Sequence, residues 1–282
     1  MGLLQGFFVS CLSVIIFLCS APAGAIYDHS LQTVDLRPFL GAPSHQGDSR
    51  NTCSAFAATA LAEFLLQQQG HGGVALSPSY TYWATRRLMA ASPFLKQLYK
   101  NVHGAPGFLA VESLSQEGVV LQRRWPYEPH APQNELPPPG LALESFVFFS
   151  EYIQRDRIAF FIMSQQRPVV FNMMWYFAAE LTRGEMRLPS LDEQSRCQQQ
   201  QKGCQGHVVL LVGYDPEKKL FLFRNSWGSQ WGDGGYGTLP EQYVLEHCEV
   251  CHLLPRIEEY PRQWQEFLRN SSAGVSARLM TR

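Results

Sequence analysis

Residues 206–237, GHVVLLVGYDPEKKLFLFRNSWGSQWGDGGYG, constrain the fold more than any other part of this chain. Two apolar runs stand on either side of the polar turn 215–219, and this pattern predicts an antiparallel β-hairpin. His207 opens the first strand of that hairpin and Asn225 follows the second, so we expect their side chains to meet. A histidine base held by an amide group requires that arrangement.

The alternative is that His207 is a structural residue of the core, whose ring nitrogens form hydrogen bonds inside the hairpin and have no catalytic role. For a lone histidine on an apolar strand that alternative is the commoner one. Asn225, the two tryptophans Trp227 and Trp231, and the glycines around them favour a functional site instead. Such a site still needs a nucleophile from elsewhere in the chain.

The composition excludes some classes of partner. Apolar residues make up 45% and charged residues 17% of the 282 residues, and the formal net charge is −1. This balance gives no electrostatic reason to expect nucleic acid or an acidic membrane surface as a partner. The chain is long enough to bury a sizeable core, as one large domain or as two closely packed halves.

The N-terminal residues 1–25 predict a secretory signal peptide. An apolar run covers 7–19, and the small residues that follow fit a small-x-small cleavage rule. The run is shorter than the roughly 20 residues that span a bilayer, so no membrane association is expected beyond the signal. No Lys or Arg precedes the run, and an uncleaved anchor or a lipidated Cys19 are the alternatives. We therefore expect a secreted or periplasmic protein.

Seven cysteines are present, and five remain after the signal is removed. An odd number in an exported protein indicates two disulfides and one free thiol, and Cys53, far from the others, is the free one by position. The remaining candidates are Cys197, Cys204, Cys248 and Cys251. They could pair in sequence order, pair crosswise or form a four-cysteine zinc site, and disulfides are favoured, with no metal site expected. A bridge between the first two would tether the segment 183–205 beside His207.

The order of the expected elements predicts an α+β fold, with helices first and strands second. Helices are expected at 52–69, 77–89, 107–117 and 153–166, and strands at 146–149, 168–175 and in the hairpin. The proline-rich segment 129–140 marks the seam between halves. We therefore expect a helical half at 26–140, a β-rich half at 141–257, and a terminal helix with a polar tail at 258–282. The glutamine run 198–201 is interpreted as a solvated loop.

Cys53 stands at the start of the first expected helix, with Asn51 or Thr52 as its N-cap. A thiol in the first turn lies at the positive end of the helix dipole, which favours the thiolate. A small buried structural cysteine is the alternative. With His207 and Asn225, this cysteine completes a set of nucleophile, base and orienting amide.

These residues, in this order, resemble the papain family (C1) of cysteine peptidases. The most specific match is NSWGSQWGDGGYG. GHVVLLVGYD, TCSAFAATALAE, VDLRP (34–38) and EGVVLQRRWPY (117–127) also match, and HQG (45–47) and LSPSYTYW (76–83) are individually weak matches. His207 lies 154 residues after Cys53, close to the roughly 130–150 residues typical of the family. The resemblance implies a two-lobed papain-like fold with the cleft between a helical half carrying Cys53 and a β-rich half carrying His207 and Asn225.

The resemblance also implies roles for single residues. Cys53 would be the nucleophile that forms a thioester, His207 the acid and base, and Asn225 the orienting residue, with Trp227 shielding their hydrogen bond. The side chain of Gln46 and the main-chain amide of Cys53 would form the oxyanion hole. Substrate-binding glycines would be Gly104, Gly107 and Gly206. The expected activity is hydrolysis of a peptide or protein substrate without a cofactor, and a protein inhibitor or regulator is a further partner to consider.

The chain departs from the family pattern near the nucleophile. Arg50 and Ser54 stand where the motif C-G-S-C-W has its first cysteine and its tryptophan, so the companion disulfide is absent. Gln46 lies seven residues before Cys53 where the family has six. A misplaced Gln46 amide would cost roughly 10²–10³ in rate. Few residues separate the expected cleavage site from VDLRP, so we expect no inhibitory pro-segment, as the resemblance to shorter bacterial members also implies.

These departures keep two further functions open. One is a catalytically inactive papain-like binding protein. The other is acyl transfer or deamidation on the same three residues.

Overall fold

The computed structural model describes residues 32–259, apart from 49, 101–103, 133, 145 and 201. The expected signal peptide and most of the expected C-terminal helix and tail lie outside these residues. The helices are α1 (Cys53–Gln68), α2 (Pro78–Ala91), α3 (Pro93–Leu98), α4 (Gly107–Gln116), α5 (Ile158–Gln165), α6 (Leu191–Gln200) and α7 (Glu241–His247). The strands are β1 (Val34–Asp35), β2 (Phe146–Ile153), β3 (Val169–Tyr176), β4 (Cys204–Asp215), β5 (Leu220–Arg224), β6 (Tyr236–Pro240) and β7 (Cys248–Glu259). The predicted α+β class is confirmed.

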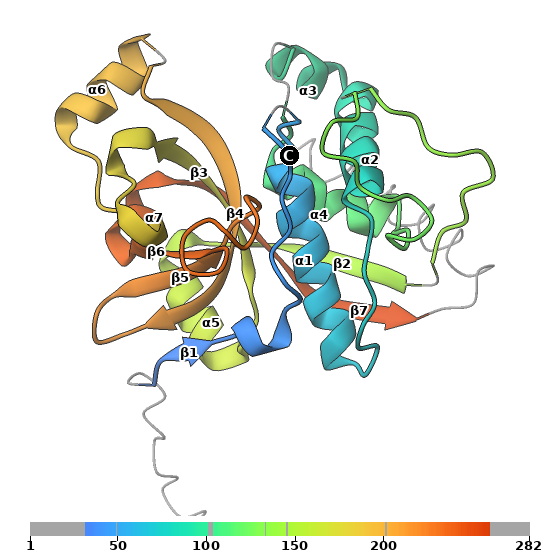
Figure 1. Cartoon of the computed structure of the whole chain (residues 1–282), viewed down its shortest axis with the longest axis horizontal. Coiled ribbons are helices and arrows are strands. Elements are labelled where there is room, and N and C mark those ends of the chain that lie inside the picture. Colours follow the sequence, from blue (N-terminus) through green and yellow to red (C-terminus); the bar gives the residue numbers. More distant parts are fainter. Residues whose placement is uncertain are drawn as a thin grey trace, which may run out of the picture.

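Helices α1–α4 gather on one side of the molecule, and β3–β6 with α5–α7 form the other side (Figure 1). The strands form one antiparallel sheet in the order β2-β7-β3-β4-β5-β6, with β1 paired to β4. Strands β2 and β7 extend beneath α4 and α1 and pack against them. The helical side is therefore built partly from strands that follow residue 141.

Strand β4 is buried on both faces, which explains its unbroken apolar run. Val208, Leu210 and Val212 enter the core shared with α1 and α4. Val209 and Leu211 enter the core on the opposite face, with β3, β5 and α7. A strand that contributes to two cores has no polar face, so its sequence shows no alternation. The predicted hairpin is confirmed as β4 and β5, with the turn closed by hydrogen bonds from two main-chain amides to Asp215.

Several expected boundaries are wrong. The α-helix expected from residue 153 begins only at Ile158, because β2 continues to Ile153 and a short 3₁₀ helix, Arg155–Arg157, precedes α5. Strand β7 covers residues 258 and 259, where a terminal helix was expected to begin, because it pairs with β2 to its end. Helix α3 was not expected, although Ser92 before Pro93 is a helix-start signal and the Ser92 side chain caps it.

Helix α6 replaces part of the loop expected between 183 and 205, and it includes the start of the glutamine run. Ser190 and Glu193 form a reciprocal capping box at its start: each side chain accepts a hydrogen bond from the other's main-chain amide. Arg187 forms an ion pair with Glu193 at 2.6 Å. The S-x-x-E pattern was present in the sequence and could have predicted this helix.

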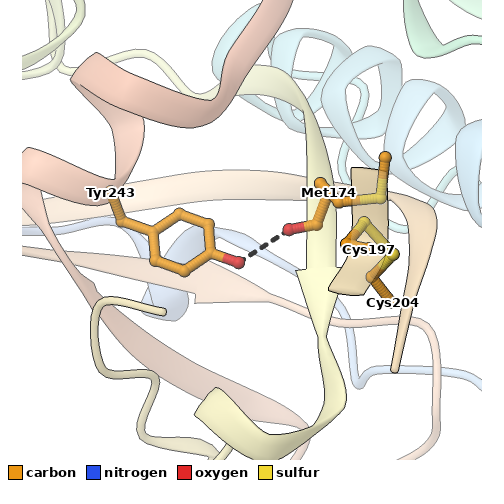
Figure 2. The surroundings of a disulfide bond; sticks show 4 residues. All are labelled: Met174, Cys197, Cys204 and Tyr243. Atoms are coloured by element: carbon orange, nitrogen blue, oxygen red, sulfur yellow. Dashed lines mark hydrogen bonds between the residues drawn. A yellow bond between two sulfur atoms is a disulfide. The ribbon is translucent and has the colours of Figure 1, made fainter. Parts of the chain in front are cut away.

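The four late cysteines form two disulfides in sequence order, Cys197–Cys204 and Cys248–Cys251, which removes the thiolates that a zinc site would need. The first joins α6 to the beginning of β4. Figure 2 shows it beside Met174 of β3, whose main-chain carbonyl accepts a hydrogen bond from the Tyr243 hydroxyl at 2.6 Å. In the described part of the chain, no helix has both the length and the apolar character needed to cross a membrane.

Candidate active site

Cys53 is the first residue of α1 and the free cysteine among the described residues, with 8% of its surface exposed. Thr52 occupies the N-cap position, but its side chain does not cap the helix as expected. Its hydroxyl group lies 2.6 Å from the hydroxyl of Tyr127 instead. The first-turn amides of α1 therefore keep no side-chain cap and point toward the region around Cys53.

His207 and Asn225 are buried side by side, with 4% and 3% of their surfaces exposed. Nε2 of His207 lies 2.8 Å from Oδ1 of Asn225, which also accepts a hydrogen bond from the main-chain amide of Ser226 at 2.8 Å. Because Oδ1 can only accept, Nε2 carries the proton in the neutral ring, and Nδ1 is left to exchange a proton. The structure thus brings together the base and amide that the hairpin pattern predicted.

Two tryptophan rings enclose the imidazole of His207. Trp227 is the residue expected to shield the histidine. The centroid of its ring lies 4.8 Å from that of the imidazole, and the angle between the ring planes is 32°. The Trp175 ring meets the imidazole edge-on at 5.2 Å. Trp175 was not predicted as a site residue, because its contact depends on the β3–β4 register, in which Met173 faces His207. That register cannot be read from either strand alone.

A cavity of about 330 Å³ lies between the two sides of the molecule. Cys53 and Gln46 line it from the helical side, and His207 and Trp227 from the β side. Gly104 and Gly206, two of the three glycines expected to bind substrate, also line it. Gly107 does not: its amide donates to Oδ1 of Asn172 at 2.9 Å, and a β-carbon there would meet Val170 and Val208 at 2.8 Å. Gly107 instead permits the close packing of α4 on the sheet.

Gln46 reaches this cavity despite the additional residue before Cys53. Its main-chain amide donates to the carbonyl of Ser226 at 2.8 Å, and its Oε1 accepts from the Ser226 hydroxyl at 2.7 Å. With Oε1 occupied, Nε2 is the end of the amide left to donate to a ligand. The connecting segment turns at Gly47 and Asn51, whose φ angles are 80° and 51°. These two left-handed residues accommodate the longer loop.

Burial dominates the electrostatics of the two titrating groups. It raises the pKa of Cys53 to about 11, although main-chain amides, including that of Val208, favour the thiolate. It lowers the pKa of His207 to about 4, and the hydrogen bond to Asn225 acts in the opposite direction. Burial thus opposes the effect of the helix dipole on Cys53. Because an opposite charge nearby favours the charged form of each group, the protonation of Cys53 and His207 is set by the two groups together.

The profile of papain family cysteine proteases matches residues 43–253, which is more than half of the chain and includes Gln46, Cys53, His207 and Asn225. The chain belongs to the papain family of cysteine proteases. A peptidase C1-like protein, L477, of Acanthamoeba polyphaga mimivirus is 26% identical over 160 residues, 51% of this chain and 48% of that protein. Cathepsin K of Gallus gallus is 36% identical over 72 residues, 23% of this chain and 21% of cathepsin K. The chain spans about half the length or less of these curated relatives.

Among solved structures, xylellain, a cysteine protease from Xylella fastidiosa, superimposes with a TM-score of 0.58. The alignment covers 79% of this chain and 85% of xylellain at 23% sequence identity. A match at this identity shows the papain-like fold, and the two-sided arrangement around the Cys53 cavity agrees with it. Within the described residues, no cluster of three or more His, Cys, Asp and Glu is placed to hold a metal ion.

Proposed function

We propose that this papain family protein is a peptidase that hydrolyses peptide bonds through a thioester on Cys53. One observation carries the proposal: Cys53 lines the same cavity as His207, and that histidine is hydrogen-bonded to Asn225. Cys53 and His207, of the residue types that serve as nucleophile and base, thus line one space large enough for a peptide segment, and the Asn225 amide is bonded to the histidine.

In the first half of the reaction, Sγ of Cys53 attacks the carbonyl carbon of the substrate. The thiol proton passes to Nδ1 of His207, so the two charges arise together and stabilise each other. The substrate oxygen takes up negative charge, and the Nε2 amide of Gln46 and the main-chain amide of Cys53 donate to it. When the C–N bond breaks, Nδ1 returns its proton to the leaving amine, and the acyl group remains on Sγ.

In the second half, Nδ1 takes a proton from water, and the hydroxide oxygen attacks the thioester carbon. The same two amides stabilise the second tetrahedral intermediate. The C–S bond breaks, the thiolate recovers a proton from His207, and the carboxylic acid product leaves. Asn225 holds the imidazole throughout by a hydrogen bond that adds no net charge, and Trp227 keeps water from it.

The proposed substrate is a peptide or protein, in line with the family. Gln205 and Gly206 line the cavity on the β side, and Gly104 and Ala105 line it on the helical side. A chain lying between them would meet main-chain groups on both walls. We also propose that the protein is exported, on the basis of the signal pattern and the two disulfides. N-terminal sequencing of protein secreted by an expressing cell would test this.

The proposed chemistry is tested by labelling Cys53. Purified protein is treated with iodoacetamide or an epoxide of the E-64 type at pH 6, and the labelled residue is mapped by mass spectrometry. We expect rapid, selective labelling of Cys53 that is lost in His207→Ala. Product masses from a peptide library then distinguish hydrolysis, which adds one water to the cleaved bond, from acyl transfer or deamidation.

A papain-like binding protein without catalysis is the second candidate. The burial that raises the pKa of Cys53 to about 11 favours it, because an unassisted buried thiol is inert. In that case Cys53 would react slowly, and His207→Ala would leave its rate unchanged. The two candidates therefore predict opposite results in the labelling experiment.

A further inference from the structure

Tyr127 lies in the segment between α4 and β2, and its hydroxyl group reaches the edge of the active site. The hydroxyl donates to the main-chain carbonyl of Gln46 at 2.5 Å and lies 2.6 Å from Oγ1 of Thr52. Because the single phenol proton goes to the carbonyl, Thr52 supplies the proton of the other hydrogen bond. Two hydrogen bonds in series therefore join Thr52, Tyr127 and Gln46.

The two residues that Tyr127 joins, Gln46 and Thr52, determine where the two oxyanion donors of the proposed reaction lie. Gln46 carries the side-chain donor Nε2, and Thr52 immediately precedes Cys53, which carries the main-chain donor. The residues that the structure describes between them, 47, 48, 50 and 51, have no regular secondary structure, and the chain turns at two left-handed residues, Gly47 and Asn51. The distance between the donors therefore depends on bonds from outside the segment: Ser226 holds Gln46 at one end, and Tyr127 bonds to residues at both ends.

The Tyr127 ring is itself held in place. The ring of Phe56 in α1 meets it edge-on, with 4.7 Å between centroids. The guanidinium of Arg50 lies over the Tyr127 ring, 4.8 Å from the ring centroid. Arg50 is 2% exposed, donates to the carbonyl of Glu128 at 2.7 Å and pairs with Glu135 at 3.2 Å. Burial also raises the pKa of Tyr127, so the phenol keeps the proton that it donates.

We propose that Tyr127 is a positioning residue that sets the separation of the two oxyanion donors, Nε2 of Gln46 and the main-chain amide of Cys53. This inference rests on the proposed peptidase function and deepens it. Donors aimed in advance at a developing negative charge lose effect quickly when they move. Loss of the Tyr127 hydroxyl should therefore affect only those steps in which the substrate oxygen becomes negative.

Two probes of Cys53 separate such steps from the rest. A peptide aldehyde adds to Sγ: the S–C bond forms, the thiol proton passes to His207, and the former carbonyl oxygen becomes negative where the oxyanion donors act. Iodoacetamide forms the same kind of S–C bond but expels iodide, and no oxyanion develops. Positioning of the donors thus matters for the aldehyde and for peptide hydrolysis and is irrelevant to alkylation.

The test compares Tyr127→Phe with the wild-type protein and with Tyr243→Phe. The control loses one tyrosine hydrogen bond to a main-chain carbonyl, that of Met174, away from the site cavity (Figure 2). For Tyr127→Phe we expect kcat and aldehyde affinity to fall roughly tenfold each, with KM and the alkylation rate within about twofold. Thr52→Val, which removes one of the two bonds, should shift the same two quantities by a smaller factor, and it serves if Tyr127→Phe does not fold.

The possible results are distinct. Equal changes in Tyr127→Phe and Tyr243→Phe, or a parallel fall in alkylation, would mean that the hydroxyl is merely structural and would overturn the inference alone. Wild-type protein that neither hydrolyses peptides nor binds the aldehyde would overturn the proposed function and this inference with it. Tenfold losses confined to Tyr127→Phe and, to a smaller extent, Thr52→Val would establish the positioning role.

Discussion

The two walls of the Cys53 cavity are held in different ways. On the β side, His207 lies in β4 and Asn225 directly follows β5 of the same hairpin, and a hydrogen bond of 2.8 Å links them. On the helical side, an irregular loop separates Gln46 from Cys53. Its ties come from Ser226, Tyr127 and Glu135, all more than 70 residues further along the chain. The comparison teaches that one wall is organised locally and the other by tertiary contacts.

The two walls should also differ in whether a substitution in the site lowers the stability of the fold as well as the activity. On the β side, β4 is buried on both faces, so the strand stays in place when a site residue is changed. On the helical side, the loop depends on a few buried polar contacts, and each such contact is costly to leave half-made. We expect chemistry to fail without loss of fold on the β side, and stability and chemistry to fail together on the helical side.

His207→Ala should give the largest effect. It removes the group that accepts the thiol proton and protonates the leaving amine, and loss of such a base lowers kcat by on the order of 10⁶. We expect the thermal midpoint to change little, because the strand pairing around position 207 is unaffected. Steady-state kinetics and differential scanning calorimetry on the same sample measure both quantities. If His207→Ala lost much stability as well as activity, the expected difference between the two walls would be contradicted.

Gln46→Ala should follow, with kcat lowered roughly 10²–10³-fold, because one of two oxyanion donors is lost. Gln67→Ala, at an exposed position of α1, is the matched control and should behave as wild type. If kcat of Gln46→Ala stays within about threefold of wild type, the extra loop residue has displaced Nε2 from the oxyanion position, and the main-chain amide of Cys53 acts without it.

Arg50→Met tests the support of the helical wall. It breaks the Arg50–Glu135 pair, in which the two side chains are 2% and 24% exposed, and leaves the glutamate without its cation. We expect the free energy of unfolding to fall by about 3 kcal/mol, measured by urea titration, with kcat reduced as Tyr127 loosens. Arg196→Met, which removes an exposed pair with Asp192, should leave both unchanged. Equal results for the two variants would contradict a supporting role for Arg50.

Cys197→Ser combined with Cys204→Ser tests the tether of the β wall. The disulfide closes a short loop, and its removal should lower the free energy of unfolding by about 2–3 kcal/mol. Because β4 remains paired with β3 and β5, we expect kcat to change less than in Arg50→Met, and KM to rise as Gln205 and Gly206 loosen. Unchanged KM for several peptides would show that the tether does not shape the cavity.

We expect the smallest effect on kcat/KM from changes of pH around neutrality. The active form of the enzyme has one titrating proton in total on Cys53 and His207. A second proton, which would leave both the thiol and the imidazole protonated, makes the pair inactive. Since the pKa of His207 is lowered to about 4, kcat/KM is present above this value and is lost as pH falls through it. The alkaline limb follows the loss of the shared proton, toward the pKa of about 11 for Cys53. An acid limb near the ordinary histidine value of about 6.5 would mean that the site is more hydrated than its burial indicates.

Much of the β wall could be predicted from the sequence, because its signals are local. The apolar runs, the turn at Asp215 and the positions of His207 and Asn225 define the hairpin without reference to other elements. Trp175 could not be predicted, because its contact with His207 depends on how β3 aligns with β4. Helix α6 was missed although the capping pattern of Ser190 and Glu193 was there, because the polar composition of the segment suggested a loop.

The helical wall could be predicted only in part. The N-terminal position of Cys53 on α1 follows from the alanine-rich helical pattern and is confirmed. The effect of the additional residue before Cys53 could not be judged, because it depends on left-handed turns at Gly47 and Asn51 and on contacts with Tyr127. The net direction of the Cys53 pKa could not be predicted for a similar reason: the helix N-terminus that lowers the pKa is visible in the sequence, whereas the burial that raises it is not.

The acyl-enzyme is the most direct test of the account. Protein mixed with an excess of a peptide ester is quenched in acid within milliseconds, and its intact mass and peptide map are measured. We predict a mass increase equal to the acyl group, located on Cys53 and formed before the acid product is released, and no increase in Cys53→Ala. Turnover that continues in Cys53→Ala, or that proceeds without any acyl group on Cys53, would contradict the proposed mechanism.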